Sequence, residues 1–230
     1  MKVRSSDGWV DLSRELAEGM VAPATHGTLS MQVVEHQIGK ISGRVSHIES
    51  ALHMGTHIDA ASHFKQGGDI DTYPMENFVG EGVILDLRRD GAVAIDRDDL
   101  ESASPAIRTN DIVFINTGYA KRDDPLSVRE HPYLTLDAAC WLVDRKIKLL
   151  GVDVQTPDMA PSIRPSEGFD WPVHHTLLPR GILIIENLGP GLELVTGHRV
   201  EILAVPLRVR GADGAPVVPL ARVIEDRNEV

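Results

Sequence analysis

Short runs of apolar residues, rich in valine, isoleucine and leucine, recur between residues 82 and 205 and are bounded by turn residues. Runs of this length that are apolar at nearly every position are typical of strands buried on both faces. Five such strands are expected, at Gly82–Leu87, Asp111–Asn116, Lys148–Asp153, Gly181–Glu186 and Val200–Val205. The pattern therefore predicts a central β-sheet.

Helical patterns are fewer. The segment Thr135–Lys146 has a threonine at the N-cap position, an acid in the first turn and bases in the last, and all three features stabilise a helix. A shorter helix is expected to begin near Asp96. The buried stripe of the longer helix is expected to contain Leu136, Cys140 and Val143, with Ile147 just beyond. Strands interleaved with only a few helices indicate a mixed α/β architecture, not a regular doubly wound fold.

Composition and charge narrow the class of protein. The 230 residues are 42% hydrophobic and 25% charged, and they show no repeat or linker, so we expect one soluble domain over residues 1–230. A net charge of −11 opposes nonspecific binding to nucleic acid or to an anionic membrane. The chain has no long apolar run and no apolar stretch typical of a signal peptide near its start. With a single cysteine, these features predict a cytoplasmic protein.

Three histidines and an aspartate, His53, His57, Asp59 and His63, fall within eleven residues. A single histidine is usually a surface or core residue, but four such side chains separated by small residues favour a metal site. Imidazole nitrogens together with carboxylate oxygens suit zinc, and also manganese or iron. Because Cys140 is the only cysteine, thiolate-rich sites are excluded.

Regular secondary structure does not bring this cluster together. On a helix, Asp59 would point away from the face that His53 and His57 share. On a strand, His53 and His57 would be about 13 Å apart. A bend at Gly55, followed by extended chain, would let His53, His57 and Asp59 converge, because glycine tolerates the backbone angles of a tight bend. His63 would then lie just beyond the metal, free to move protons.

Acids at the ends of two predicted strands are further candidates, because open α/β sheets bind ligands at the carboxyl ends of their strands. Asp153 could equally be a turn residue. Glu186 follows four apolar residues, so its burial requires a cation or base nearby. A histidine twelve or eleven residues earlier, His174 or His175, could complete a second cation site. Both a dinuclear site sharing Asp59 and a mononuclear site with an open position remain consistent with the sequence.

The residues resemble the cyclase family of metal-dependent hydrolases, which includes bacterial kynurenine formamidases and isatin hydrolases. The first histidine motif matches through Phe64, apart from Ala61, where the family has proline. The remaining matches are Asp11–Ser13, Thr117–Gly118, His131–Thr135, Gly151–Asp153, Pro172–His174 and Gly181–Leu188. Thr156 replaces a serine common in relatives.

The resemblance implies a swivelling β/β/α fold with a central mixed sheet and flanking helices, in a homodimer or homotetramer. It implies one or two divalent ions, with Zn²⁺ expected and Mn²⁺ the alternative. His53, His57 and Asp59 would hold the first ion, while Asp59, His174 and Glu186 would hold or surround the second. His63 would be the catalytic acid/base.

The sequence thus predicts a metal-dependent hydrolase that cleaves an amide or lactam C–N bond of a small molecule, as kynurenine formamidase and isatin hydrolase do. A lactone or cyclic ester hydrolase is one alternative, and a noncatalytic metal or ligand binder is another. The substrate-binding residues are unknown at this point. Trp9, Phe64, Tyr73 and Trp171 are candidates for an aromatic wall, although core packing is the common role of such residues.

Overall fold

A computed structural model describes residues 7–224, which contain one nine-stranded mixed sheet. The strand order is β1 (Val10–Asp11), β13 (Leu220–Val223), β11 (Arg199–Leu203), β5 (Val79–Asp86), β7 (Ile112–Asn116), β9 (Leu149–Val152), β10 (Leu183–Glu186), β4 (His57–Asp59) and β12 (Gly214–Pro216). Neighbours from β5 to β10 pair in parallel, and the flanking strands pair antiparallel. All five predicted strands are present and adjacent.

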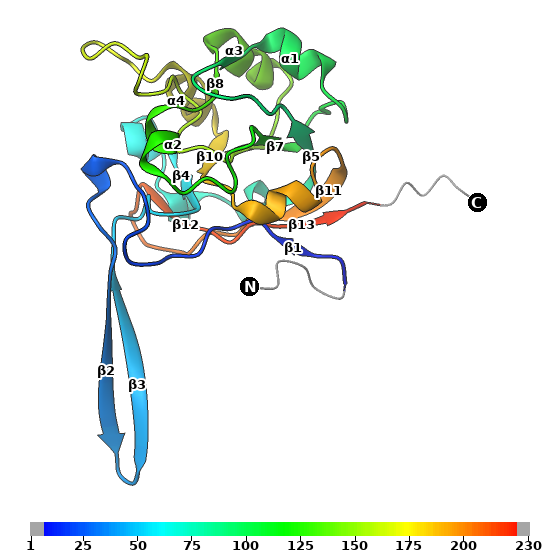
Figure 1. Ribbon diagram of the computed structural model, residues 1–230. Helices are drawn as coiled ribbons and strands as arrows, with labels where there is room; N and C mark the ends of the chain where they lie inside the picture. Colours follow the sequence, from blue (N-terminus) through cyan, green and yellow to red (C-terminus); the bar gives the residue numbers. More distant parts are fainter. Residues whose placement is uncertain (1–6, 225–230) are drawn as a thin grey trace.

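The central strands bury both faces. Successive side chains of a strand point to opposite sides, so Val83 and Val113 enter one apolar core while Ile84 and Phe114 enter the other. The first core is covered by α1 (Arg97–Ser102), α3 (Leu136–Asp144) and α4 (Pro172–Leu177) (Figure 1). The second lies where the sheet curls toward the 3-10 helix η6 (Pro190–Leu194). This arrangement confirms the mixed α/β fold and explains the continuous apolar runs.

The two predicted helices are present, but the buried stripe of the longer one was predicted correctly only in part, because Val143 is half-buried and Ile147 is buried as expected, whereas Leu136 and Cys140 are not. Thr135 caps α3 by accepting a hydrogen bond from the Ala138 amide. Leu136 is 53% exposed and Cys140 is also exposed, whereas the buried residues are Ala138, Ala139, Trp141 and Leu142. The small alanine side chains let the helix approach its neighbours closely, so the packed face lies about one position away from the one that the larger apolar residues indicated.

A hairpin that the sequence pattern did not reveal, β2 (Ser30–Ile38) with β3 (Ile41–Glu49), stands away from the body (Figure 1). The remaining elements are β6 (Ala94–Ile95), β8 (Tyr133–Leu134), α2 (Pro125–Arg129) and the short 3-10 helices η1 (Ala24–His26), η2 (Ala61–Phe64), η3 (Ile70–Thr72), η4 (Met75–Asn77) and η5 (Leu178–Arg180). Among residues 7–224, none of the helices has the length and apolar content that crossing a bilayer requires.

Candidate metal centre

The chain bends at Gly55 and then enters β4, as the sequence predicted. Gly55 has a φ of +65°, in the left-handed region that favours glycine, and a side chain there would stand 2.6 Å from Leu16 Cδ2. The bend returns His53 to the side chains of β4, so that its Nδ1 lies 2.8 Å from Asp59 Oδ1. His57 Nε2 lies 3.5 Å from the same oxygen. The first three predicted ligands therefore converge.

Strand register brings Glu186 to this group. β10 pairs antiparallel with β4 so that Glu186 is directly opposite His57, and Glu186 Oε2 lies 3.3 Å from His57 Nε2. The α4 helix supplies His174, whose Nε2 is 3.3 Å from both Asp59 Oδ2 and Glu186 Oε1. His174 is 2% exposed, while His175 lies outside the cluster, edge-on to Phe64. The structure thus places His174, and not His175, beside the other predicted ligands.

These side chains fit a divalent cation. The ligand atoms of His53, His57 and Asp59 lie within 4.8 Å of one another, and so do those of Asp59, His174 and Glu186. His57 Nε2 is buried and, despite its closeness to Glu186, has no hydrogen bond of proper alignment. A buried nitrogen without a partner is costly, and a cation bound to its lone pair removes that cost.

Mutual interactions shift the proton affinities of the cluster. Burial by itself raises the pKa of Asp59, but the bonds to His174 and His53 hold it well below its ordinary value. Burial and the Asp59 charge act to raise the pKa of Glu186, yet His174 and His57 lower it overall. Both carboxylates are therefore ionised, which is the form that binds metal.

The three histidines respond in the opposite sense. Burial acts to lower the pKa of His53, but Asp59 and Asp213 raise it to about 9. In the same way, burial is outweighed at His57 by Glu186 and Asp59 and at His174 by Asp158, so both pKa values rise. Because metal binds neutral imidazole, an incoming cation must displace protons from this cluster.

His63 lies beside the cluster, as predicted, and has a partner that the sequence analysis missed. Its ring centre is 4.2 Å from that of His53, and its Nδ1 is 3.0 Å from Asp213 Oδ2. The same oxygen is 2.9 Å from His53 Nε2. Asp213 belongs to a Gly-Ala-Asp-Gly turn, which by itself indicates only a loop. Pairing of the adjacent β12 with β4 is what brings it to the site.

Asp158 is a second missed residue. It is fully buried, and its Oδ2 lies 2.5 Å from His174 Nδ1. It also accepts hydrogen bonds from the backbone N–H groups of Val173 and His174 at the start of α4. A carboxylate on Nδ1 keeps the proton there and leaves Nε2 free to bind metal. The twelve residues between Asp158 and Trp171, the N-cap of α4, hide this relationship in the sequence.

Asp153, the other acid at a strand end, serves the fold. It accepts hydrogen bonds from the Thr117 amide and hydroxyl and from the amides of Tyr119 and Ala120. These bonds shape the turn after β7. The sequence left open whether Asp153 is a ligand or a turn residue, and in the structure it is a turn residue.

The cluster is part of a pocket of about 390 Å³, a volume in the range of small-molecule sites. Two of the four candidate aromatic residues, Phe64 and Trp171, line it, but Trp9 and Tyr73 do not. The complete lining is Pro23, Thr25, His26, His53, Asp59, His63, Phe64, Val128, Gln155, Thr156, Pro161, Arg164, Trp171, His174 and Glu186. The pocket therefore combines ligating groups with apolar walls.

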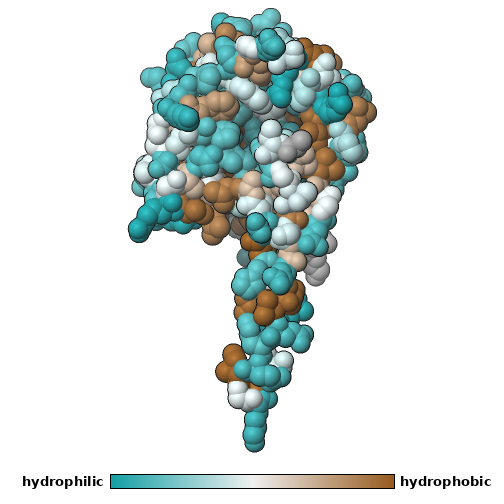
Figure 2. Space-filling view, turned by 90° about the vertical axis from the view of Figure 1, so that its left-hand side faces the viewer, coloured by the Kyte–Doolittle hydropathy of each residue, from teal (hydrophilic) through white to brown (hydrophobic). Residues whose placement is uncertain are grey.

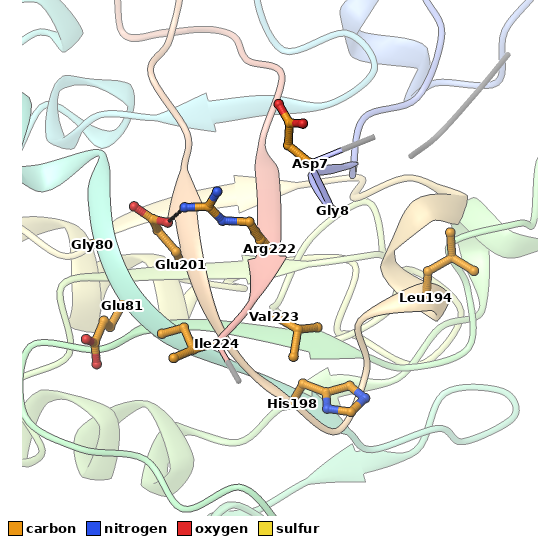
Figure 3. A pocket seen from close by; sticks show the side chains of 10 residues that line it. All are labelled: Asp7, Gly8, Gly80, Glu81, Leu194, His198, Glu201, Arg222, Val223 and Ile224. Carbon is orange, nitrogen blue, oxygen red and sulfur yellow. Dashed lines mark hydrogen bonds and ion pairs between the residues drawn. The ribbon is translucent and has the colours of Figure 1, made fainter. Parts of the chain in front are cut away.

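A larger hollow, about 890 Å³, lies over β5, β11 and β13 (Figure 3). Its charged side chains include Arg222 and Glu201, which pair with each other at 2.5 Å. It shares no lining residue with the pocket of the cluster, and the three ligating groups found among the described residues all lie outside it. Size alone therefore does not mark the functional site.

Three buried histidines and two buried carboxylates, gathered at one edge of a mixed sheet beside a small-molecule pocket, define a metal-binding α/β enzyme. Comparison with known proteins agrees. The sequence profile of the family described as "Putative cyclase" matches residues 10–159. The kynurenine formamidase of Bacillus cereus is 30% identical over 220 residues, which cover 94% of this chain and 98% of that protein. The kynurenine formamidase of Salinibacter ruber is 32% identical over 178 residues, 76% of this chain and 78% of that one.

Solved structures share the fold. A predicted metal-dependent hydrolase from Bacillus stearothermophilus superposes with a TM-score of 0.72 at 29% identity, over 93% of this chain and 97% of that one. Isatin hydrolase A from Labrenzia aggregata, bound to benzyl benzoate, gives a TM-score of 0.80 at 24% identity, over 94% of each chain. The chain belongs to the cyclase family, as its motifs predicted.

Proposed function

We propose that this enzyme, a metal-dependent hydrolase of amide C–N bonds, acts on a small substrate with an aromatic ring. The observation that carries the proposal is the buried cluster around His57 Nε2, which has no hydrogen bond, open to a pocket walled by Phe64 and Trp171. The relatives named kynurenine formamidase and isatin hydrolase support amide cleavage. No observation favours the lactone hydrolase or the noncatalytic binder over it.

His53, His57, Asp59, His174 and Glu186 are the proposed metal ligands. A divalent ion held there would act as a Lewis acid, polarising the substrate carbonyl and lowering the pKa of water. Zn²⁺ is the ion we propose, with Mn²⁺ as the alternative, because both accept imidazole and carboxylate ligands. Two ligand groups share Asp59, so the cluster has places for one or two ions.

His63 is the proposed acid/base. Hydrolysis adds a water oxygen to the carbonyl carbon and breaks the C–N bond, so one proton must leave the water and one must reach the departing nitrogen. With Nδ1 of His63 held by Asp213, its Nε2 is the nitrogen available for both transfers. The His63 side chain is 28% exposed, which gives it contact with the pocket while the ligands beside it are buried.

The test is the His63→Ala variant. We expect the purified variant to keep the metal content of the wild type while turnover of N-formylkynurenine or isatin falls about 10²- to 10⁴-fold, the range for loss of an acid/base group. The exposed His198, in the other hollow, offers a matched control, His198→Ala, with unchanged turnover. Parallel loss of metal and activity would make His63 a ligand. Failure of metal-loaded wild type to hydrolyse any amide would refute the proposed function.

A homodimer or homotetramer, formed through the β2–β3 hairpin, completes the proposal. The hairpin carries six of the fifteen exposed large apolar side chains of the described residues: Met31, Val33, Ile38, Ile41, Val45 and Ile48. Figure 2 shows patches of hydrophobic atoms, in brown, on the face of the projection turned to the viewer. An isolated two-stranded hairpin is marginally stable in water, and an apolar surface of this kind is typical of an interface. A second copy of the chain would cover it.

Light scattering tests this assembly. An Ile38→Asp, Ile41→Asp variant changes the opposed pair at the hairpin tip and should yield monomers, whereas Leu126→Asp, an exposed site elsewhere, should not. A monomeric wild type would refute the assembly. A single domain over residues 1–230 and a cytoplasmic location are retained as proposals, supported by the unbroken composition and the single cysteine.

A further inference from the structure

One guanidinium in the pocket has no hydrogen bond or ion pair with the described residues. Among the described residues, Arg164 is the only lysine or arginine that lines the pocket of the cluster. It is half-buried, yet no carboxylate of residues 7–224 lies within 4.0 Å of it, and its side chain donates no hydrogen bond to them. By contrast, Arg14, which is also largely buried, donates to three backbone carbonyls. The donors of Arg164 are therefore available to a ligand.

The surroundings hold Arg164 in place. Its guanidinium carbon stands 4.5 Å from the ring centre of Trp171 and 5.5 Å from that of Phe169, both within the range of a cation–π contact. Its backbone amide donates to the Ala160 carbonyl, and the neighbouring Ser162 amide donates to Arg129 of α2. A group fixed in this way loses little entropy when a ligand binds.

Trp171 itself has an unusual backbone. Its φ is +51°, in the left-handed region that bulky residues rarely adopt, and it is the N-cap residue of α4. From this position it contacts Arg164 and also lies edge-on to His174, with ring centres 5.9 Å apart. Such strain persists only where the surrounding structure imposes it, and it concentrates at functional sites.

The aromatic rings connect this guanidinium to the metal ligands. Trp171 lies 6.0 Å from Phe64, and Phe64 lies 5.1 Å from His174, measured between ring centres. The pocket thus presents ligating groups, an aromatic wall beside them, and the positive charge of Arg164 against the Trp171 ring of that wall. On this wall the positive charge of Arg164 attracts an anion. A planar guanidinium binds carboxylate through two parallel hydrogen bonds.

We propose that Arg164 binds a carboxylate of the substrate, so that the enzyme acts on aromatic amides that carry a negative charge on the part of the molecule remote from the scissile bond. This inference rests on the proposed amide hydrolysis and adds the substrate's charge to it. Arg164 is then a specificity-determining residue, and the metal ligands bind the reacting amide at the other end of the substrate.

Paired substrates test the charge. Formanilide and the formamidobenzoates contain the same aryl formamide bond, but only the latter carry a carboxylate. Arg164→Gln should lower kcat/KM for the best formamidobenzoate by about 10- to 100-fold, mainly through KM, and change that for formanilide less than threefold. Arg164→Lys should fall between, because it keeps the charge and loses the planar pair of donors. The exposed Arg108, remote from the pocket, provides the control Arg108→Gln.

Binding provides a readout that is independent of turnover. Calorimetry on the metal-free protein should show tighter binding of benzoate than of benzamide, and Arg164→Gln should abolish the difference. An equal loss of kcat/KM for formanilide and formamidobenzoate in Arg164→Gln would overturn the proposal, because Arg164 would then only support Trp171. The absence of a preference for benzoate over benzamide in the wild type would also overturn it. If wild type hydrolyses neither formamide but its preference for benzoate depends on Arg164, the carboxylate site stands and amide hydrolysis fails.

Discussion

Replacement of Asp158 by asparagine should weaken metal binding indirectly, through the proposed ligand His174. Among residues 7–224, the Asp158 carboxylate accepts hydrogen bonds only from Val173 and His174, and its Oδ2 accepts the one from His174 Nδ1–H at 2.5 Å. Asparagine keeps the shape of the side chain but replaces one acceptor oxygen with an NH₂ donor. The consequences depend on which way that amide turns, and both orientations lose something.

If the amide NH₂ faces His174, Nδ1 must become the acceptor. The ring proton then moves to Nε2, the nitrogen directed at Asp59 and Glu186, and blocks it as a metal ligand. If the amide oxygen faces His174, the NH₂ opposes the Val173 N–H, which donates to Asp158 at 2.8 Å. That buried donor is then unsatisfied at a cost of about 1–3 kcal/mol of folding free energy.

In the first orientation we expect metal affinity to fall about 10- to 100-fold, and in the second we expect the free energy of unfolding to fall by about 1–3 kcal/mol. A mixture of the two orientations would give a smaller loss of each kind. Competition with a chelator measures the first, and urea unfolding of the metal-free protein measures the second. Asp170→Asn, an exposed change in the same loop, is the control. Affinity within twofold and stability within about 0.5 kcal/mol of the wild type would refute the role given to Asp158.

Three further predictions concern the fold around the site. Gly55→Ala should destabilise more than Gly91→Ala and also reduce metal content, since both glycines have positive φ but only Gly55 faces a close contact, Leu16 at 2.6 Å; equal thermal shifts would contradict this. Asp153→Ala leaves four donors unpaired and should cost at least about 3 kcal/mol in urea unfolding, against less than about 0.5 kcal/mol for the half-exposed Asp86→Ala. Burial lowers the pKa of His131, so on acidification the unfolded chain takes up the proton at a higher pH than the folded protein does. The free energy of unfolding is therefore unaffected by this group above about pH 6.5 and falls below that pH by up to about 1.4 kcal/mol per pH unit. His131→Asn should flatten that part of the pH dependence in metal-free protein, and an unchanged slope would contradict the assignment.

Local pattern was sufficient where the physical cause is local. The five buried strands appeared as apolar runs because both faces of the central sheet are covered, and the helix caps at Asp96 and Thr135 are formed with residues three positions away. The failure in α3 has a local origin too. Helical spacing suggested Leu136 and Cys140 for the buried face, but the helix packs through Ala138, Ala139, Trp141 and Leu142.

The projecting hairpin was missed for a related reason. Its exposed strands mix apolar and polar residues on both faces, since no core of this chain covers either one. The apolar runs that reveal a buried strand are therefore absent from it. In the proposed assembly a second copy of the chain would bury the hairpin. Burial of that kind involves two chains, so it leaves only a weak hydrophobic pattern in the sequence of one.

The sequence by itself predicted the proposed donors of the metal centre, the bend at Gly55 and the family, because each depends on residue type and short spacing. Only the tertiary structure decided which side chains complete the site. The β4–β10 register sets Glu186 opposite His57, and the pairing of β12 with β4 delivers Asp213. The roles proposed for Asp158 and Arg164 depend on their neighbours in the folded protein. Asp158 contacts His174, and Arg164 packs on the aromatic ring of Trp171 without a carboxylate partner. Contacts between residues so far apart in the chain depend on how its strands pair and its helices pack, which local sequence patterns do not specify.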